Sequence, residues 1–193
     1  MHKLIDLIKQ SGAVREFKET EIPTFLIDRI VKSGIWGLSV LGIQPWKFVP
    51  VKNKAVIAGL SKIVLDKSDN VVDGANIVLR VTSRIIQKAG AIIVVYNNQK
   101  LEKRAEKFGQ LYVKRAYVAE IQAIGGAIQN MILQTNELGL GCVWLDAITF
   151  CSKEINCFLK EDGELVAFVA IGYPATKPHR SKRQDDNVKK SFI

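Results

Sequence analysis

Apolar residues in the first half of the chain recur mostly at the three- and four-residue intervals of amphipathic helices. This spacing predicts helices over residues 3–10, from Pro23 to about Gly37, over 54–66 and over 75–88. The segment from Trp46 to Val51 differs because its positions alternate, which is typical of a strand. Pro50 cannot donate a backbone hydrogen bond, so this strand is expected to be short or to lie at a sheet edge.

The second half combines short strands with one very long periodic segment. Ala91 to Tyr96 is rich in β-branched residues and carries no charge, which indicates a buried strand. Helical periodicity extends from about Leu101 to Leu138, and Gly139 is well placed to end it in the left-handed conformation. The remaining elements are expected to be strands at Cys142–Leu145 and Glu164–Gly172 and a short helix at Lys153–Leu159.

The order of these elements predicts an α+β fold. Helices and strands do not alternate regularly enough for a doubly wound parallel sheet. No repeat, low-complexity block or linker divides the sequence, so residues 1–193 are expected to form a single domain. Beyond Tyr173-Pro174, a basic tail without hydrophobic pattern continues almost to the end of the chain.

Small residues form a stripe along the long predicted helix. They recur at three- and four-residue intervals at Ala119, Ala123, Gly126, Ala127 and Asn130. Each glycine inside a helix costs about 1 kcal/mol relative to alanine, so the adjacent Gly125 and Gly126 need an explanation. Close approach of another helix or of a flat ligand would explain them, and so would ordinary tight packing within one subunit.

Composition narrows the class of protein. Apolar residues make up 48% of the 193, which excludes a disordered chain, and three cysteines are too few for a disulfide scaffold. The longest apolar runs fall far short of a membrane span, and the N-terminus leads into an amphipathic segment. We therefore expect a cytoplasmic protein with no membrane partner. Its 28 basic and 19 acidic side chains give a formal charge of +9, which suits nucleic acid, a membrane surface or a small anion.

Two of the possible partners are disfavoured by residue patterns. The spacing of Cys142, Cys151 and Cys157 matches no common zinc motif, so no metal site is expected. The basic clusters at Lys100–Lys107 and Lys177–Lys190 are interleaved with acidic residues and carry no nucleic-acid-binding motif. We therefore expect no nucleic-acid partner.

Four segments that are weak signals individually become specific in combination. They are Ala13-Val14-Arg15-Glu16-Phe17, the loop from Leu38 to Phe48 with Gln44-Pro45-Trp46, Gln129-Asn130 followed by Glu137 to Gly141, and Gly172-Tyr173-Pro174 with its basic tail. In this order and spacing they resemble the nitroreductase superfamily of FMN-dependent oxidoreductases. The resemblance covers most of the chain.

The resemblance implies a central mixed, mostly antiparallel sheet flanked by helices, and a homodimer. The long helix would lie at the centre of the dimer, two FMN sites would form at the interface, and the tail from about residue 175 to 193 would extend onto the partner. The implied activity is ping-pong hydride transfer from NAD(P)H through FMN to a small-molecule acceptor such as a nitroaromatic or a quinone. Because the flavin carries the hydride, no catalytic side chain is required.

The resemblance also implies the residues that bind FMN. Arginine binds phosphate bidentately, and by motif position Arg15 and Arg183 are the best phosphate ligands, with Lys182 and Arg180 as helpers. Ser39 and Gln44 would contact the isoalloxazine ring and ribityl chain. Backbone groups around Asp146 and Ala147 would lie near the flavin N5 edge.

Several positions depart from the family pattern. Ser11-Gly12-Ala13 replaces residues that usually contact the phosphate, although Ser11 and the following amides could compensate. Gly42 replaces the loop asparagine, and Leu38 replaces a proline. A frequent acidic residue of the long helix falls at Ala123, one turn from Glu120. These losses motivate a second hypothesis, in which the protein binds a flavin or nucleotide with little or no turnover.

Overall fold

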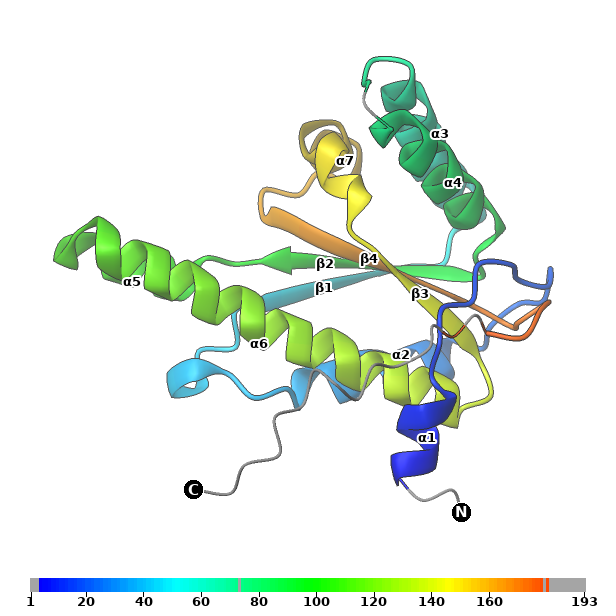
Figure 1. The fold of residues 1–193 in the computed structure, drawn as a ribbon, viewed down its shortest axis with the longest axis horizontal. Coiled ribbons are helices and arrows are strands. Elements are labelled where there is room, and N and C mark those ends of the chain that lie inside the picture. The colour runs from blue at the N-terminus through cyan, green and yellow to red at the C-terminus, as the bar shows by residue number, and fades with distance from the viewer. Residues whose placement is uncertain (1–3, 73, 179, 181–193) are drawn as a thin grey trace.

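A four-stranded sheet forms the centre of the fold in the computed structural model, which describes residues 4–72, 74–178 and 180 (Figure 1). Its strands are β1 (Trp46–Val51), β2 (Ala91–Asn97), β3 (Gly141–Leu145) and β4 (Glu164–Gly172), in the order β1-β2-β4-β3. All three neighbouring pairs are antiparallel. The parallel pairing expected of a mixed sheet is confined to an isolated bridge between Ala13 and Cys142. Strand β1 lies at an edge, as Pro50 predicts.

Helices cover both faces of the sheet (Figure 1). They are α1 (Leu4–Gln10), α2 (Thr24–Ile35), α3 (Lys54–Ser68), α4 (Ala75–Lys88), α5 (Lys100–Ala105), α6 (Gln110–Glu137) and α7 (Ser152–Leu159). Three short 3₁₀ turns accompany them, η1 (Val40–Gly42), η2 (Glu106–Phe108) and η3 (Ala147–Cys151). Helices α2 and α6 pack on one face of the sheet, and α3, α4 and α7 on the other. The predicted α+β class is confirmed.

Strand β2 explains how one short apolar run can serve two hydrophobic cores. Every residue of β2 is buried. Ile92 and Val94 belong to the core under α3 and α4, whereas Ile93 and Val95 belong to the core under α2 and α6. Successive side chains of a strand point to opposite faces, so a sheet covered on both sides needs an uninterrupted apolar strand at its centre.

The long periodic segment is divided into two helices, which corrects the predicted single helix over residues 101–138. Helix α5 and the η2 turn end before Gly109, and α6 begins at Gln110. Gly109 has a φ of 97°, outside the helical region and readily adopted only by glycine. The apolar period continues across this break because α5 packs along the first turns of α6. Periodicity alone therefore could not locate it.

The end of α6 follows the prediction. Gly139 has a φ of 73°, its N–H donates to the Asn136 carbonyl, and the Leu140 N–H donates to the Thr135 carbonyl. These two bonds form a Schellman motif, which satisfies carbonyls that the helix itself leaves unpaired. The motif turns the chain directly into β3, which begins at Gly141. The position of β3 against the site described below therefore depends on this cap.

Candidate functional site

The segment from Ala13 to Lys18 is fixed between two strands. The Val14 N–H donates to the Cys142 carbonyl of β3 at 2.9 Å, and the Lys18 N–H donates to the Tyr173 carbonyl beyond β4 at 2.8 Å. Val14 and Phe17 are buried, whereas Arg15 between them is exposed. Two buried anchors therefore hold one arginine at the surface, at the edge of the sheet.

Gly141 allows this segment to approach β3. A Cβ atom at Gly141 would lie 2.7 Å from Cγ2 of Val14, a stiff and buried side chain. We predict that Gly141→Ala lowers the free energy of unfolding by about 1–3 kcal/mol, because the segment must shift. Urea unfolding measures this.

The matched control is Gly125→Ala. Its added methyl would meet Trp144 at an ordinary 3.7 Å. Removal of a glycine from the interior of α6 is expected to raise stability by up to about 1 kcal/mol. Equal urea-unfolding midpoints for the two variants would contradict the conclusion that Gly141 allows the 13–18 segment to approach β3.

The basic tail leaves the fold beside Arg15. The Ala175 N–H donates to the Glu16 carbonyl at 3.0 Å, which places the start of the tail next to this arginine. Arg180 is exposed, and Arg15 has no ion-pair partner among the described residues. Lys182 and Arg183, the other predicted phosphate ligands, lie outside the described residues, as does most of the tail assigned to the partner subunit.

Strand β3 lies between Arg15 and the two residues predicted to contact the flavin ring, Asp146 and Ala147. The 13–18 segment joins the start of β3 at Cys142, and Asp146 and Ala147 follow its end. At 3.2–3.4 Å per residue, the four steps from Cys142 to Asp146 span about 13 Å. Asp146 is exposed and Ala147 is buried at the start of η3. An extended molecule with an anionic end and a flat end fits this separation.

The loop that carries Ser39 and Gln44 has an unusual backbone. Leu41 and Gln44 have φ values of 54° and 51°, and Gly42 has a φ of 64°. The Gln44 N–H donates to Ser39 Oγ at 3.1 Å, so the two predicted ligands also support each other. Non-glycine residues in this region cost free energy and cluster at functional sites. Gly42 replaces the asparagine of the family pattern. Glycine and asparagine both adopt a positive φ readily, so the replacement suits this loop conformation.

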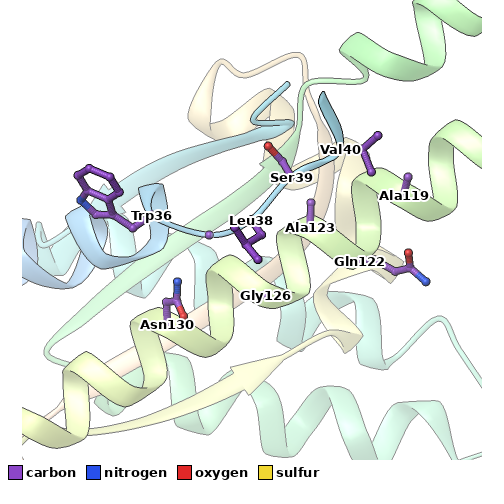
Figure 2. Close-up of a pocket in the computed structure, with 10 residues that line it drawn as sticks. Trp36, Leu38, Ser39, Val40, Ala119, Gln122, Ala123, Gly126 and Asn130 are labelled. Carbon is purple, nitrogen blue, oxygen red and sulfur yellow. The ribbon is translucent and has the colours of Figure 1, made fainter. Parts of the chain in front are cut away.

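This loop and α6 enclose a groove with a volume of about 690 Å³. Figure 2 shows Ser39 and Val40 above one end of it, with Gly126 and Asn130 of α6 along its floor. A Cβ at Gly126 would meet no atom within 4 Å, so the groove is open above this position.

The small-residue stripe therefore has two roles. Gly37, in the chain after α2, approaches Ala127 so closely that a Cβ would lie 3.1 Å from the Ala127 Cα. Ala127 thus serves tight packing within the subunit. Ala119, Ala123, Gly126 and Asn130 line the open groove. Tight packing therefore explains part of the stripe, and the approach of a ligand or another helix to the groove stays a prediction.

One copy of the chain does not gather all the predicted ligands in this groove. Its lining includes Ser39, but not Arg15, Gln44, Asp146 or Ala147. Sequence patterns missed the exposed apolar residues that surround the loop. Trp36, Leu38 and Leu41 are 85%, 91% and 86% exposed. Their only sequence signal is an apolar run where the helical period stops.

Glu120 does not take the place of the acidic residue missing at Ala123. It is buried and accepts hydrogen bonds from the Leu101 N–H at 2.6 Å and from Asn97 Nδ2 at 3.1 Å. Asn97 Nδ2 also donates to Glu164 at 2.9 Å. Glu120 therefore fixes the start of α5 against the end of β2, away from the groove.

Glu102 lies beside this pair of carboxylates, and one of its buried oxygens has no hydrogen-bond partner among the described residues. Burial raises the pKa of Glu102 above its ordinary value, and the charges of Glu164 and Glu120 raise it further. Ionisation of Glu102 therefore penalises the folded state, and stability falls as the pH rises through the ordinary carboxyl range.

Glu102→Gln is accordingly expected to raise the thermal midpoint at pH 8. The gain should disappear below about pH 4, where the carboxyl is neutral in both states. Thermal unfolding at the two pH values measures this. Glu19→Gln, at an exposed position, is the control. An equal gain in thermal midpoint at both pH values would show that Glu102→Gln acts through packing and not through the ionisation of Glu102.

The described residues contain neither a metal-binding cluster nor a membrane-spanning helix. Within residues 4–72, 74–178 and 180, no cluster of three histidine, cysteine or acidic side chains could hold a metal ion. In that part of the chain, no helix has both the length and the apolar content needed to cross a bilayer.

Burial raises the pKa of the Cys142 thiol to about 12 and that of Cys151 to about 11, so both thiols stay protonated at neutral pH.

The family model for nitroreductases matches residues 8–173, which include the 13–18 segment, the strained loop, α6 and all of β4. The chain belongs to the nitroreductase family. The match confirms the resemblance found in the four sequence motifs. It ends at Tyr173, so it does not extend to the basic tail.

Relatives and solved structures agree with this family. YfhC of Bacillus subtilis, whose name assigns it an NAD(P)H nitroreductase activity, is 24% identical over 187 residues, covering 93% of this chain and 89% of that protein. A BluB-like flavoprotein of Clostridium difficile superposes over all of both chains with a TM-score of 0.82 at 24% identity. A nitroreductase-like protein of Desulfovibrio desulfuricans, solved in complex with FMN, covers 100% and 99% of the two chains with a TM-score of 0.74 at 23% identity. These structures establish the nitroreductase fold.

Proposed function

We propose that this protein is an FMN-dependent oxidoreductase that uses NAD(P)H to reduce a nitroaromatic, a quinone or a related small acceptor. The observation that carries the proposal is the position of Arg15. It is an exposed guanidinium without an ion-pair partner among the described residues, one strand length from Asp146 and Ala147. The backbone of its segment is fixed at both ends, so the point from which the Arg15 side chain extends is set before a ligand arrives.

The residues around Arg15, Asp146 and Ala147 suit FMN. Arg15 would bind the phosphate dianion, with Arg180 and residues of the tail as helpers. The region around Asp146 and Ala147 would contact the ring. When bound, FMN supplies the acceptor and donor of hydride, while the chain binds, orients and shields the reacting molecules.

A homodimer would complete the site. Ser39 and the open groove beside Gly126 lie apart from the surface that carries Arg15, so a second copy is needed to bring both sets of residues to one ligand. The exposed Trp36, Leu38 and Leu41 support this arrangement, because apolar side chains gathered around one loop are typical of an interaction surface. Burial of this face would place α6 near the dimer axis and exclude water from the ligand.

The second hypothesis, a flavin- or nucleotide-binding protein with little or no turnover, gains support from Ser11. Its hydroxyl donates to the Ile8 carbonyl at 2.8 Å, and its N–H donates to the Leu7 carbonyl at 2.9 Å. These bonds direct Ser11 toward the end of α1 and limit its ability to replace the missing phosphate contacts. Weak phosphate binding is the consequence.

Visible spectroscopy under anaerobic conditions separates the two hypotheses. The purified protein, supplied with FMN, should show a bound-flavin spectrum that bleaches when NADH or NADPH is added. Bound flavin that neither nicotinamide reduces would favour the second hypothesis. Failure to bind FMN at all would refute the first hypothesis and the flavin-binding form of the second. Comparison of the bleaching rates with NADH and NADPH identifies the preferred electron donor.

A further inference from the structure

A second groove lies between the strained loop and the α5–η2 segment. We call it the basic groove. It has a volume of about 550 Å³ and is lined by Val40, Leu41, Ile43, Leu101, Arg104, Ala105, Lys107, Phe108, Tyr112, Arg115, Ala116 and Ala119. It adjoins the groove over Gly126, because Val40 and Ala119 line both. A ligand in the basic groove would therefore lie next to the surface proposed to hold the flavin.

The charges of the basic groove are all positive. Arg104, Lys107 and Arg115 come from α5, η2 and α6, and no acidic residue is part of the lining. Among the described residues, none of these three cations has an ion-pair partner. Three converging cations on an apolar surface create a positive potential that attracts a small anion.

Two other cavities that carry cations also carry acidic residues. Arg29 forms an ion pair with Glu137, and both line a cavity beside α1. Lys52 forms an ion pair with Glu21, and both line a cavity near the end of α4. Each of these two cavities keeps an excess of one positive charge in its lining, whereas the basic groove has three cations and no acidic residue.

The walls of the basic groove indicate the rest of the ligand. Phe108 and Tyr112 form a tilted aromatic pair with ring centroids 5.7 Å apart, and both rings are more than half exposed. The Lys107 ammonium lies 5.0 Å from the centroid of the Phe108 ring. An exposed aromatic pair beside cations suits a flat ring that carries a negative group. The volume is that of a small-molecule site.

We infer that the basic groove selects, as the electron acceptor, a nitroaromatic or quinone whose ring also bears an anionic group such as a carboxylate or sulfonate. The nitro or quinone group would take the hydride that NAD(P)H supplies through the flavin, with a proton from solvent, and the anionic group would stay unchanged. The inference rests on the proposed function, because it makes the basic groove the acceptor end of the flavin site. The aromatic pair and the loop side chains would hold the ring, and Arg104, Lys107 and Arg115 would hold its anionic group.

Binding measurements test this without turnover. The probes are 4-nitrobenzoate and its neutral analogue 4-nitrobenzamide, with Kd measured by equilibrium dialysis on flavin-loaded and flavin-free protein. The wild type should bind the acid at least tenfold more tightly than the amide at low ionic strength. The double variant Arg104→Gln/Arg115→Gln should reduce that preference to about twofold, and added salt should also weaken it.

Arg84→Gln, at an exposed position on α4 across the sheet, is the matched control and should keep the preference. Equal binding of acid and amide by the wild type would overturn the inference, as would a preference that survives in the double variant. If the double variant instead weakens only NADPH relative to NADH, the cations belong to the nucleotide phosphate and the acceptor assignment is wrong. Failure of FMN to bind or to be reduced would refute the proposed function and would leave these binding ratios measurable.

Discussion

Arg15→Gln is expected to weaken FMN binding by about 10- to 100-fold. A hydrogen bond to a charged group contributes about 1.5–3 kcal/mol, and each 1.4 kcal/mol corresponds to a factor of ten in Kd. The effect should be near the upper end because Ser11 is bonded within its own helix end and compensates poorly. Glutamine keeps a hydrogen-bond donor but loses the charge and the bidentate fork that suit a phosphate dianion.

Fluorescence titration of FMN measures this loss, and Arg84→Gln is the control of equal charge change. Arg15 is exposed, so urea unfolding of the variant without FMN should match the wild type within about 0.5 kcal/mol. An unchanged Kd for FMN in Arg15→Gln would remove the central observation of the proposed function. A loss of stability equal to the loss of affinity would show that Arg15 acts on the fold instead.

Leu38→Asp is expected to convert the proposed homodimer into a monomer and to abolish tight FMN binding. Leu38 is 91% exposed in one copy, so the change should have little effect on the stability of a monomer. Burial of a leucine contributes about 1.5–3 kcal/mol, and a two-fold axis doubles the loss because the same patch occurs on both subunits. The dimer dissociation constant should therefore rise by at least about 100-fold.

Sedimentation equilibrium measures the association, and FMN titration is repeated on the same samples. Ile77→Asp places the same charge at an exposed apolar position of α4, on the other face of the sheet. That variant should remain dimeric and should bind FMN. A Leu38→Asp protein that dimerises normally would exclude the loop from the interface, and a monomeric wild type that binds FMN tightly would exclude the composite site.

Local patterns were sufficient for most elements of secondary structure. The β-branched run of β2 and the cap at Gly139 depend on residues close to them in the chain, and both formed where predicted. The edge position of β1 also followed from a local property, since Pro50 lacks a donor. These features were predictable because backbone sterics and alternation are determined by neighbouring residues.

The conformation of the candidate loop depends on distant contacts. Sequence motifs selected Ser39 and Gln44, but not the positive φ of Gln44. Asn98, beyond the end of β2, donates from its side chain to the Gln44 carbonyl at 3.1 Å, and its N–H donates to the Pro45 carbonyl at 2.7 Å. A strained backbone that a remote residue stabilises leaves no periodic signal in the sequence.

The break between α5 and α6 at Gly109 was also not predictable from the local sequence. Apolar residues continue at helical spacing through Leu101 and into α6, so the pattern predicts one helix. The bond from the Leu101 N–H to the buried carboxylate of Glu120 joins α5 back to α6 and requires two separate segments. Periodicity reports which side of an element is buried, but not which element buries it.

The sequence by itself determined the fold class and the family, and it singled out Arg15 as the residue that we propose for a flavin phosphate. Arg15 is recognisable because its motif and its chemistry are both local. Only the tertiary structure decided that Gly126 lines an open groove while Ala127 packs against Gly37, and that Arg104, Lys107 and Arg115 line one groove instead of forming separate solvated charges. A cavity exists where segments distant in the chain meet, and its charge is the sum of side chains from different elements.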